Sequence, residues 1–208
     1  YSEFKIPFYA QSYPTTLNEY KIQKLSEIGL DRLGMGLEHG NEEFRRDIVK
    51  RSYSNQKAID QTAILRKYDF SYSLNNIVGF PTETRDEAQD TINFLGKNLH
   101  SIHSFGPGVF LLNRDSSCYQ YPEKFSITKI IKNPEANMAM NLDFEASSGM
   151  SREEAVEMNT KCISMAEEKF PSLQIWGTLP REHFLLYLDR YGKEGLSGNG
   201  PPEKKEDE

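Results

Sequence analysis

Hydrophobic and polar residues along this chain follow two alternating periods. Short apolar runs bounded by turn residues predict four β-strands, at residues 4–10, 32–37, 70–80 and 102–112. Between them, apolar positions three and four residues apart predict α-helices, at residues 15–28, 41–51, 55–65 and 84–99. Strands that alternate with helices over short connections imply parallel pairing with right-handed crossovers.

Polar residues at the predicted helix starts support this interpretation. Thr15 or Thr16 can cap the first helix and Asn41 the second, because a side-chain oxygen there can accept from a free backbone N–H. Thr84-Arg-Asp-Glu87 has the spacing of a capping box before the fourth helix. Gly29 fits the stop signal of the first helix.

The predicted architecture is an α/β fold: a partial (βα) TIM-like barrel with parallel strands, plus a helical C-terminal extension. We assign residues 1–112 to the half-barrel. Residues 113–192 form an irregular and helical extension, with one helix after a capping box at 151–154 and another at 182–191. Residues 193–208 carry Gly, Pro and alternating charge, which is typical of a disordered tail.

Composition and charge exclude several function classes. The net charge is −6 with both signs interspersed, so no clustered basic face for nucleic acid is expected. No apolar run approaches the roughly 20 residues of a membrane helix, so we expect no membrane partner. The chain starts at Tyr1 without a secretory signal, and its 2 cysteines form neither a disulfide framework nor a CxxC site. A cytoplasmic protein is the expectation.

Two strand-to-helix turns carry the most specific residues. The first reads Gly36-Leu-Glu38-His39-Gly40, and its following helix is expected to end at Arg51. The second reads Asn76-Ile-Val-Gly79-Phe-Pro81-Thr-Glu83-Thr84. These linked motifs resemble the second half of the radical S-adenosylmethionine (radical SAM) enzyme family. Asn-Glu-Glu after Gly40 and Lys-Arg at the close of the following helix resemble the cobalamin-associated subgroup, although His39 replaces the commoner serine.

The resemblance implies a cofactor set and a reaction type. In this family a reduced [4Fe–4S] cluster donates an electron to S-adenosylmethionine, and either a 5′-deoxyadenosyl radical or, with cobalamin, a methyl group is delivered. Only this resemblance implies the remaining partners. They are a reductant such as ferredoxin or flavodoxin, cobalamin bound to the intact protein, and a small-molecule or peptide substrate. No motif in the chain identifies the substrate.

The family's CxxxCxxC loop, whose three thiolates hold the cluster, does not occur in this sequence. Cys118 and Cys162 are far apart, and neither follows a first strand. We therefore expect the chain to begin at about the third barrel strand, with the cluster ligands upstream of Tyr1, and to be inactive alone. Cys118 is a candidate for a substrate or auxiliary-cluster role, whereas Cys162, on an apolar helix face, is expected in the core.

Glu38 and Arg51 each have a functional and a structural interpretation. The resemblance implies that Glu38 accepts hydrogen bonds from the ribose hydroxyls and that Arg51 binds the cofactor's carboxylate or a ribose oxygen. Otherwise Glu38 is a helix N-terminal carboxylate or a partner of Arg51, and Arg51 is a cation at a helix C-terminus.

The other candidate cofactor-binding residues are Gln11, Asn76, Gly79 and Pro81. Only one of Asn75 and Asn76 can point inward, since neighbouring strand residues face opposite sides. The family pattern favours Asn76 as the ribose-binding residue. Gly79 would let the backbone approach the adenosine while Pro81 fixes the turn. Gln11 either binds the cofactor's amino end or fills the barrel mouth.

Several further residues are expected to have structural roles. Glu83 and Thr84 would cap the following helix, and the strand residues 109–112 would offer backbone contacts to adenine. The histidines have no metal-ligand spacing and are expected on the surface or in loops: His39, His100, His103 and His183.

Two other functions stay open at this point. One is a non-catalytic, nucleotide-binding half-barrel without a cluster. The other is an unrelated βα-barrel lyase or isomerase, which predicts a catalytic lysine or a carboxylate cluster at the strand ends, and neither stands out in the sequence.

Overall fold

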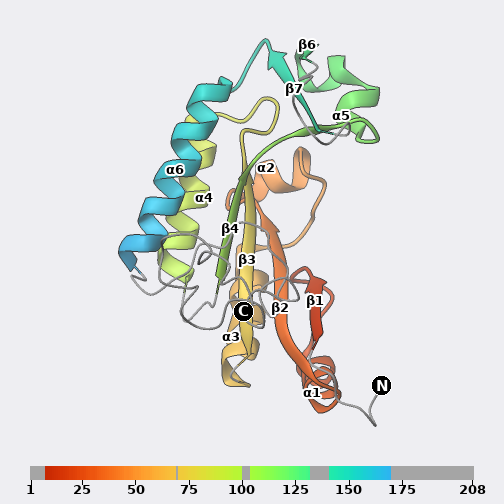
Figure 1. Ribbon diagram of the computed structural model, residues 1–208, viewed down its shortest axis with the longest axis vertical. Helices are drawn as coiled ribbons and strands as arrows, with labels where there is room; N and C mark the ends of the chain where they lie inside the picture. The colour runs from red at the N-terminus through yellow and green to blue at the C-terminus, as the bar shows by residue number, and fades with distance from the viewer. Residues whose placement is uncertain (1–7, 69, 100–103, 132–140, 170–208) are drawn as a thin grey trace, which may run out of the picture. The chain divides into compact units, whose positions relative to one another are not determined.

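The computed structural model describes residues 8–68, 70–99, 104–131 and 141–169, all within one compact unit, Tyr1–Ile175 (Figure 1). The start of the first predicted strand, the predicted helix at 182–191 and the predicted tail at 193–208 lie outside the described residues.

A four-stranded parallel sheet forms the centre of this unit (Figure 1). Its strands, in spatial as well as chain order, are β1 (Phe8–Ser12), β2 (Leu30–Glu38), β3 (Ser71–Val78) and β4 (Ser104–Val109). The four strands and their parallel pairing are therefore confirmed. Because all four run the same way, their carboxyl ends share one edge of the sheet, where candidate residues were expected.

Helices connect the strands as predicted, with their starts and ends shifted by up to four residues. They are α1 (Glu19–Glu27), α2 (Glu42–Asp47), α3 (Asn55–Lys67) and α4 (Arg85–Asn98). The cap of α1 is Asn18, not Thr15 or Thr16, because the Asn18 side chain accepts from the Lys21 N–H. The Thr84 capping box of α4 is confirmed, with both of its hydrogen bonds present.

One face of the sheet packs against helices, and the opposite face carries the alternate residues of each strand. The helix face carries the apolar side chains of one core cluster, among them Leu33, Met35, Leu37, Tyr72, Leu74 and Val78. The alternate positions, including Gly34, Gly36, Asn75 and Ile77, belong to the second face, which we call the inner face. The inner face is thus the one that a barrel would enclose.

The extension was expected to be irregular, but its described residues 113–131 and 141–150 contain most of a small antiparallel sheet. It consists of β5 (Leu112–Asn113), β7 (Asn141–Ala146) and β6 (Ile127–Ile131) in that order, with α5 (Ser117–Gln120) and a 3₁₀ turn, η1 (Pro122–Phe125), between β5 and β6. Leu112, Ile127 and Leu142 form its own buried cluster. Apolar positions this far apart in sequence give no local period from which a strand could be predicted.

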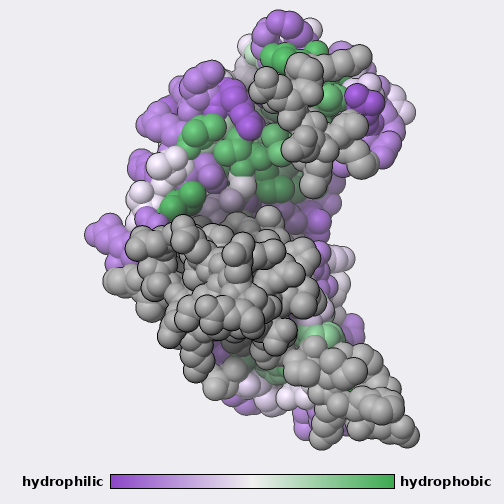
Figure 2. Space-filling model, in the orientation of Figure 1, coloured by the Kyte–Doolittle hydropathy of each residue, from purple (hydrophilic) through white to green (hydrophobic). Residues whose placement is uncertain are grey.

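Helix α6 (Arg152–Lys169) starts at the predicted capping box, with reciprocal bonds between Ser151 and Glu154. It packs on α4, β3 and β4, and its apolar side joins the main core through Ala155, Met158, Cys162 and Ala166. In Figure 2 apolar side chains gather between the start of α6 and the small sheet, and Val156 and Leu111 are among the exposed hydrophobic residues of the described chain. No helix in the described part is long and apolar enough to cross a membrane.

Candidate functional site

Asn75, not Asn76, occupies the inner face of β3. Asn76 is 1% exposed and its Nδ2 lies 3.9 Å from Cys162 Sγ of α6, on the helix face. Asn75 is half-buried and pairs with Gly36 on one side and Gly106 on the other. The inward orientation predicted for Asn76 is therefore wrong. Side chains in a strand alternate between the two faces of the sheet. Which of two adjacent asparagines points inward depends on where that alternation begins, and the sequence alone does not determine this.

Glu38 ends β2 in a left-handed conformation, with φ of 67°. Its carboxylate folds back along the strand, and an added Cβ at Gly36 would lie 2.5 Å from Glu38 Oε1. Gly36 is thus needed for the close approach of this side chain. The Glu38 side chain is 16% exposed, and burial raises the pKa of its carboxyl although Arg51 acts in the opposite direction.

Arg51 meets Glu38 at the rim. Its Nη2 lies 3.3 Å from Glu38 Oε1, and its guanidinium stands 5.3 Å from the centre of the Tyr13 ring. The expectation that Arg51 closes a helix is wrong, because α2 ends at Asp47 and Arg51 lies in the loop before α3. The Arg51 guanidinium therefore does not lie at a helix terminus. It pairs with the Glu38 carboxylate, which was one of the alternatives expected from the sequence.

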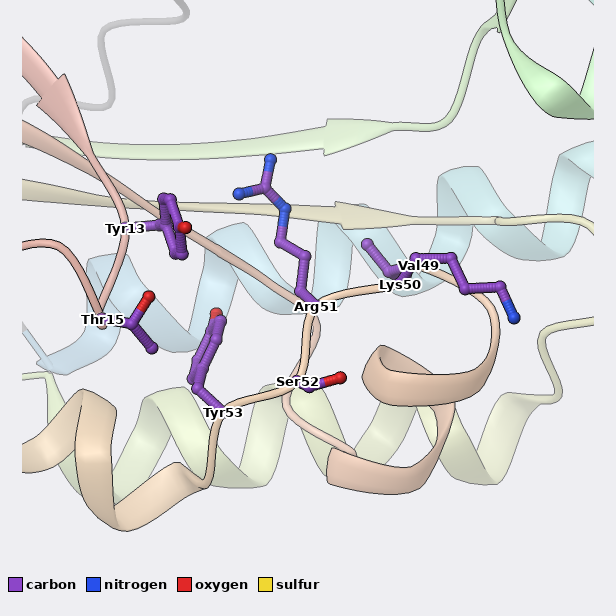
Figure 3. Close-up of a pocket in the computed structure, with 7 residues that line it drawn as sticks. All are labelled: Tyr13, Thr15, Val49, Lys50, Arg51, Ser52 and Tyr53. Atoms are coloured by element: carbon purple, nitrogen blue, oxygen red, sulfur yellow. The ribbon is translucent and has the colours of Figure 1, made fainter.

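A pocket of about 460 Å³ adjoins this ion pair. Tyr13 and Thr15, from the loop after β1, face Arg51 and Tyr53 of the α2–α3 loop across it (Figure 3). Tyr53 donates its hydroxyl to the carbonyl of Leu37 at 2.6 Å, which ties the pocket wall to β2. Burial raises the pKa of Tyr53 to about 12, so its phenol remains a donor at neutral pH.

Arg45 is a buried residue that sequence reasoning missed. Its guanidinium donates to the His39 carbonyl at 2.5 Å, to Asn55 Oδ1 at 2.8 Å and to the Tyr53 carbonyl at 2.7 Å. It also stacks 4.2 Å from the Tyr53 ring centre, and burial lowers its pKa. Its position on the apolar side of a short helix is the only sequence signal that could have revealed it.

His39 and Glu83 form a buried pair that joins the two sequence motifs. Both side chains are 0% exposed, and His39 Nε2 lies 3.0 Å from Glu83 Oε1. The other carboxylate oxygen accepts from the backbone N–H groups of Gly79 at 2.6 Å and Phe80 at 2.9 Å. His39 lies in a loop, as expected, but it is buried and not on the surface. The expectation that Glu83 caps the following helix is wrong, because its carboxylate accepts from the N–H groups of the turn after β3, which need an internal acceptor.

Two structural features explain why residue 79 is a glycine. Its φ is 84°, and an added Cβ would lie 2.6 Å from the Cβ of Ala155 in α6. Pro81, in the same turn, is buried. The close approach seen here is to a helix of this chain, and a cofactor contact is not needed to explain the glycine.

The remaining candidates divide between rim and core. Gln11 is exposed near the end of β1 and pairs with Gly34, so it shares the inner face. Cys162 is buried in the core as expected, and burial raises its pKa to about 12. Cys118 is half-buried at the small sheet. His100, His103 and His183 lie outside the described residues.

No group of three or more His, Cys, Asp or Glu side chains within the described ranges could hold a metal ion. The rim instead offers a carboxylate, a guanidinium and an amide from three segments: Glu38 of β2, Arg51 of the following loop and Asn75 of β3. This set can bind a molecule that carries both a cation and an anion together with hydroxyl groups.

Residues 3–95 match a family profile described as the Radical SAM superfamily. The chain is also similar in structure to the radical S-adenosylmethionine methyltransferase TsrM from Kitasatospora setae with cobalamin and a [4Fe–4S] cluster bound, with a TM-score of 0.64 and 12% identity over 94% of this chain and 42% of that chain. Archaeal Elp3 from Methanocaldococcus infernus gives a TM-score of 0.58 and 17% identity, covering 92% of this chain and 42% of that chain.

Coproporphyrinogen III oxidase (HemN) from Escherichia coli, described as a radical SAM enzyme, gives a TM-score of 0.57 and 15% identity over 78% of this chain and 32% of that chain. No curated protein sequence matches the chain. At these identities the structural similarity establishes the α/β half-barrel fold alone. The chain spans between 32% and 42% of the length of these three structures.

Proposed function

Because residues 3–95 match the profile of the radical SAM superfamily, we propose that this chain supplies S-adenosylmethionine-binding strands to a [4Fe–4S]-dependent radical enzyme. The single observation that carries the proposal is the Glu38–Arg51 pair at the carboxyl ends of the strands. The methionine part of the cofactor carries an ammonium and a carboxylate. Those two charges match the carboxylate and the guanidinium on this rim.

The ion pair gives the rim a way to bind such a group without leaving a charge unpaired. Glu38 and Arg51 contact each other at 3.3 Å, and both side chains are partly accessible. A ligand carboxylate that takes Arg51 and a ligand ammonium or hydroxyl that takes Glu38 would replace one contact with two. An exchange of this kind avoids the free-energy cost of an isolated, partly buried carboxylate.

Asn75 is the residue of β3 that supports ribose binding. Its amide can donate to and accept from hydroxyl groups, and its strand neighbours Gly36 and Gly106 have no side chains to cover it. An added Cβ at Gly108 would meet only the Asn76 carbonyl, at 3.9 Å, so the backbone beside Ile77 is open to close approach. We assign Asn75 and Gly108 to the cofactor surface in place of Asn76 and Gly79.

The residues present do not fit the iron–sulfur cluster itself. A cluster of this type needs three thiolates, whereas the chain has 2 cysteines, one of them buried in the core. We propose that the cluster ligands come from a preceding segment of the intact protein. The cluster and cofactor supply the radical chemistry when bound, and this chain's residues bind and orient the adenosine and methionine ends.

The cobalamin-associated subgroup, a ferredoxin or flavodoxin reductant and a cytoplasmic location remain part of the proposal. The Asn41-Glu-Glu and Lys50-Arg51 residues support the subgroup. An oxygen-sensitive cluster also suits a reducing compartment. The substrate is a small molecule or peptide whose class no residue of the chain identifies.

One alternative is a non-catalytic half-barrel that binds a nucleotide without a cluster. The deciding observation is the coding sequence upstream of Tyr1, where we expect a CxxxCxxC motif roughly 80 to 120 codons away, an estimate from βα units of about 30 residues. If the motif is present, anaerobic reconstitution and S-adenosylmethionine titration of the intact protein test the proposal. Absence of the motif, together with nucleotide binding, would favour the alternative.

A further inference from the structure

The cofactor surface draws on two separate strand ends, and one buried contact joins them. Glu38, at the end of β2, is followed directly by His39, and its positive φ sends the Glu38 carboxylate and the His39 ring in different directions. Asn75 and Ile77 belong to β3, which leads directly into Gly79 and Phe80. His39 bonds to Glu83, and Glu83 bonds to the N–H groups of that turn.

The hydrogen bonds fix the protonation pattern of the His39 ring. The Asn41 backbone N–H donates to His39 Nδ1 at 3.1 Å, so Nδ1 carries no proton. The proton therefore lies on Nε2 and is donated to Glu83 Oε1 at 3.0 Å. Glu83 then accepts from three donors, which are His39 Nε2 and the N–H groups of Gly79 and Phe80. No polar atom of the pair is left without a partner, as a buried network requires.

We propose that His39 is a positioning residue: through Glu83 it holds the turn after β3 against the end of β2, so that Glu38 and Asn75 face the same ligand. This inference rests on the proposed function for the identity of that ligand. Ring packing follows the same route, since His39 stacks on Phe44 at 4.5 Å and Phe44 lies 6.0 Å from Phe80. The polar contact and the aromatic contact thus join the same two segments.

Two substitutions at His39 separate its two hydrogen bonds. In His39→Gln the side-chain amide nitrogen stands where Nε2 stood, so the donor to Glu83 is kept and the acceptor for Asn41 is lost. In His39→Asn the side-chain oxygen stands where Nδ1 stood, so the acceptor for Asn41 is kept and the link to Glu83 is lost. The variants are matched in polarity and differ in which neighbour they retain.

A control is available at the same rim. The Gly40 N–H donates to Thr91 Oγ1 at 2.9 Å, and Thr91→Val removes that buried acceptor without touching His39 or Glu83. We expect Thr91→Val to lower the melting temperature and leave ligand affinity unchanged. It measures what a loss of stability alone does to binding. If His39→Asn fails to fold, Glu83→Asp withdraws the carboxylate from the ring and serves in its place.

The experiment is S-adenosylmethionine titration of the reconstituted intact protein, with amide hydrogen exchange of Gly79 and Phe80 as a second readout. We expect His39→Asn to weaken affinity about fivefold or more and to speed exchange of both amides about tenfold, with His39→Gln within about twofold of the unsubstituted protein. Equal affinities for His39→Asn and His39→Gln would overturn the proposal. If the unsubstituted protein binds no S-adenosylmethionine, the proposed function fails, and the exchange readout alone decides the role of His39: unchanged exchange in His39→Asn overturns it.

Discussion

Asn75 and Asn76 are consecutive in β3 and face opposite sides of the sheet. Asn76 lies against Cys162 beneath α6, with its Oδ1 buried and without a hydrogen-bond partner. Asn75 faces the same side as Gly36 of β2. One amide therefore packs in the core, and the other lies on the inner face, which we propose as the binding surface.

Substitution of the two asparagines should give opposite results. We expect Asn75→Ala to weaken S-adenosylmethionine binding about two- to tenfold, the effect of one lost hydrogen bond, with little change in melting temperature. Asn76→Ala should change the melting temperature and leave affinity unaltered. Titration and thermal melting of both variants of the intact protein measure this. A larger affinity loss in Asn76→Ala than in Asn75→Ala would contradict the assignment.

Glu38 should show a conflict between binding and stability. Burial raises the pKa of Glu38 above the usual 4.5. Between pH 4.5 and the raised pKa, the folded protein therefore keeps a proton that the unfolded protein has released. Stability therefore falls as the pH rises from 4.5 through the raised folded pKa. Glu38→Gln should melt at a higher temperature than the unsubstituted protein above this window and at the same temperature below it. Thermal melts across pH 3 to 8, about the range that brackets carboxyl titration, measure the difference.

The same Glu38→Gln variant should bind S-adenosylmethionine less tightly, because the charge that pairs with the ligand is gone. A variant that is less stable at pH 8 than the unsubstituted protein would show that burial does not dominate the environment of Glu38.

Two glycines provide a matched test of packing and ligand approach. Gly79→Ala places a side chain at φ of 84° and 2.6 Å from Ala155, so we expect it to lower the free energy of unfolding by about 1–3 kcal/mol or more. Gly108→Ala meets only the Asn76 carbonyl at 3.9 Å and should leave unfolding nearly unchanged while weakening cofactor binding. Denaturant unfolding of each variant and titration of Gly108→Ala measure the two effects. Unaltered affinity in Gly108→Ala would place the ligand elsewhere.

Arg45 should be among the most sensitive residues for stability. It donates to two backbone carbonyls and one side chain while nearly enclosed by protein. Arg45→Met keeps about the same side-chain length and leaves those acceptors unpaired, so we expect a loss of about 2 kcal/mol or more in the free energy of unfolding. The exposed Arg46, which forms an ion pair with Asp47, is the matched control, and Arg46→Met should change the free energy of unfolding by less than about 0.5 kcal/mol.

Local patterns were sufficient for the half-barrel, because each strand and helix has its own period and cap. The capping boxes at Thr84 and Ser151 are examples in which four residues define a helix start. The small sheet could not be predicted this way, since β7 pairs with β5 on one side and β6 on the other, and this pairing rather than local preference stabilises the strands.

The candidate site was predictable in part for a similar reason. The sequence motifs singled out Glu38 and Arg51, and their pairing was one of the expected alternatives, which the contact between the two side chains bears out. The position of Arg51 in a loop instead of at a helix end was not predicted. The motifs could not give the facing of Asn75, which depends on strand phase, nor the pairing of His39 with Glu83, which are 44 positions apart in the sequence. Contacts between distant segments arise from the packed sheet and leave no periodic signal along the chain.

The chain of residues 1–208 alone should hold no [4Fe–4S] cluster, because 2 cysteines cannot supply three thiolates. Anaerobic reconstitution followed by iron and sulfide analysis measures this. A stoichiometric cluster would contradict the assignment of its ligands to another segment.

The most direct test of the account is reductive cleavage of S-adenosylmethionine by the anaerobically reconstituted intact protein, with 5′-deoxyadenosine and methionine quantified by mass spectrometry beside iron content. The account predicts cleavage by the unsubstituted protein and a loss of about tenfold or more in Glu38→Ala at unchanged iron content, since a charge-assisted contact is removed. A protein that carries the cluster and cleaves the cofactor equally well with and without Glu38 would contradict the claim that this rim binds it.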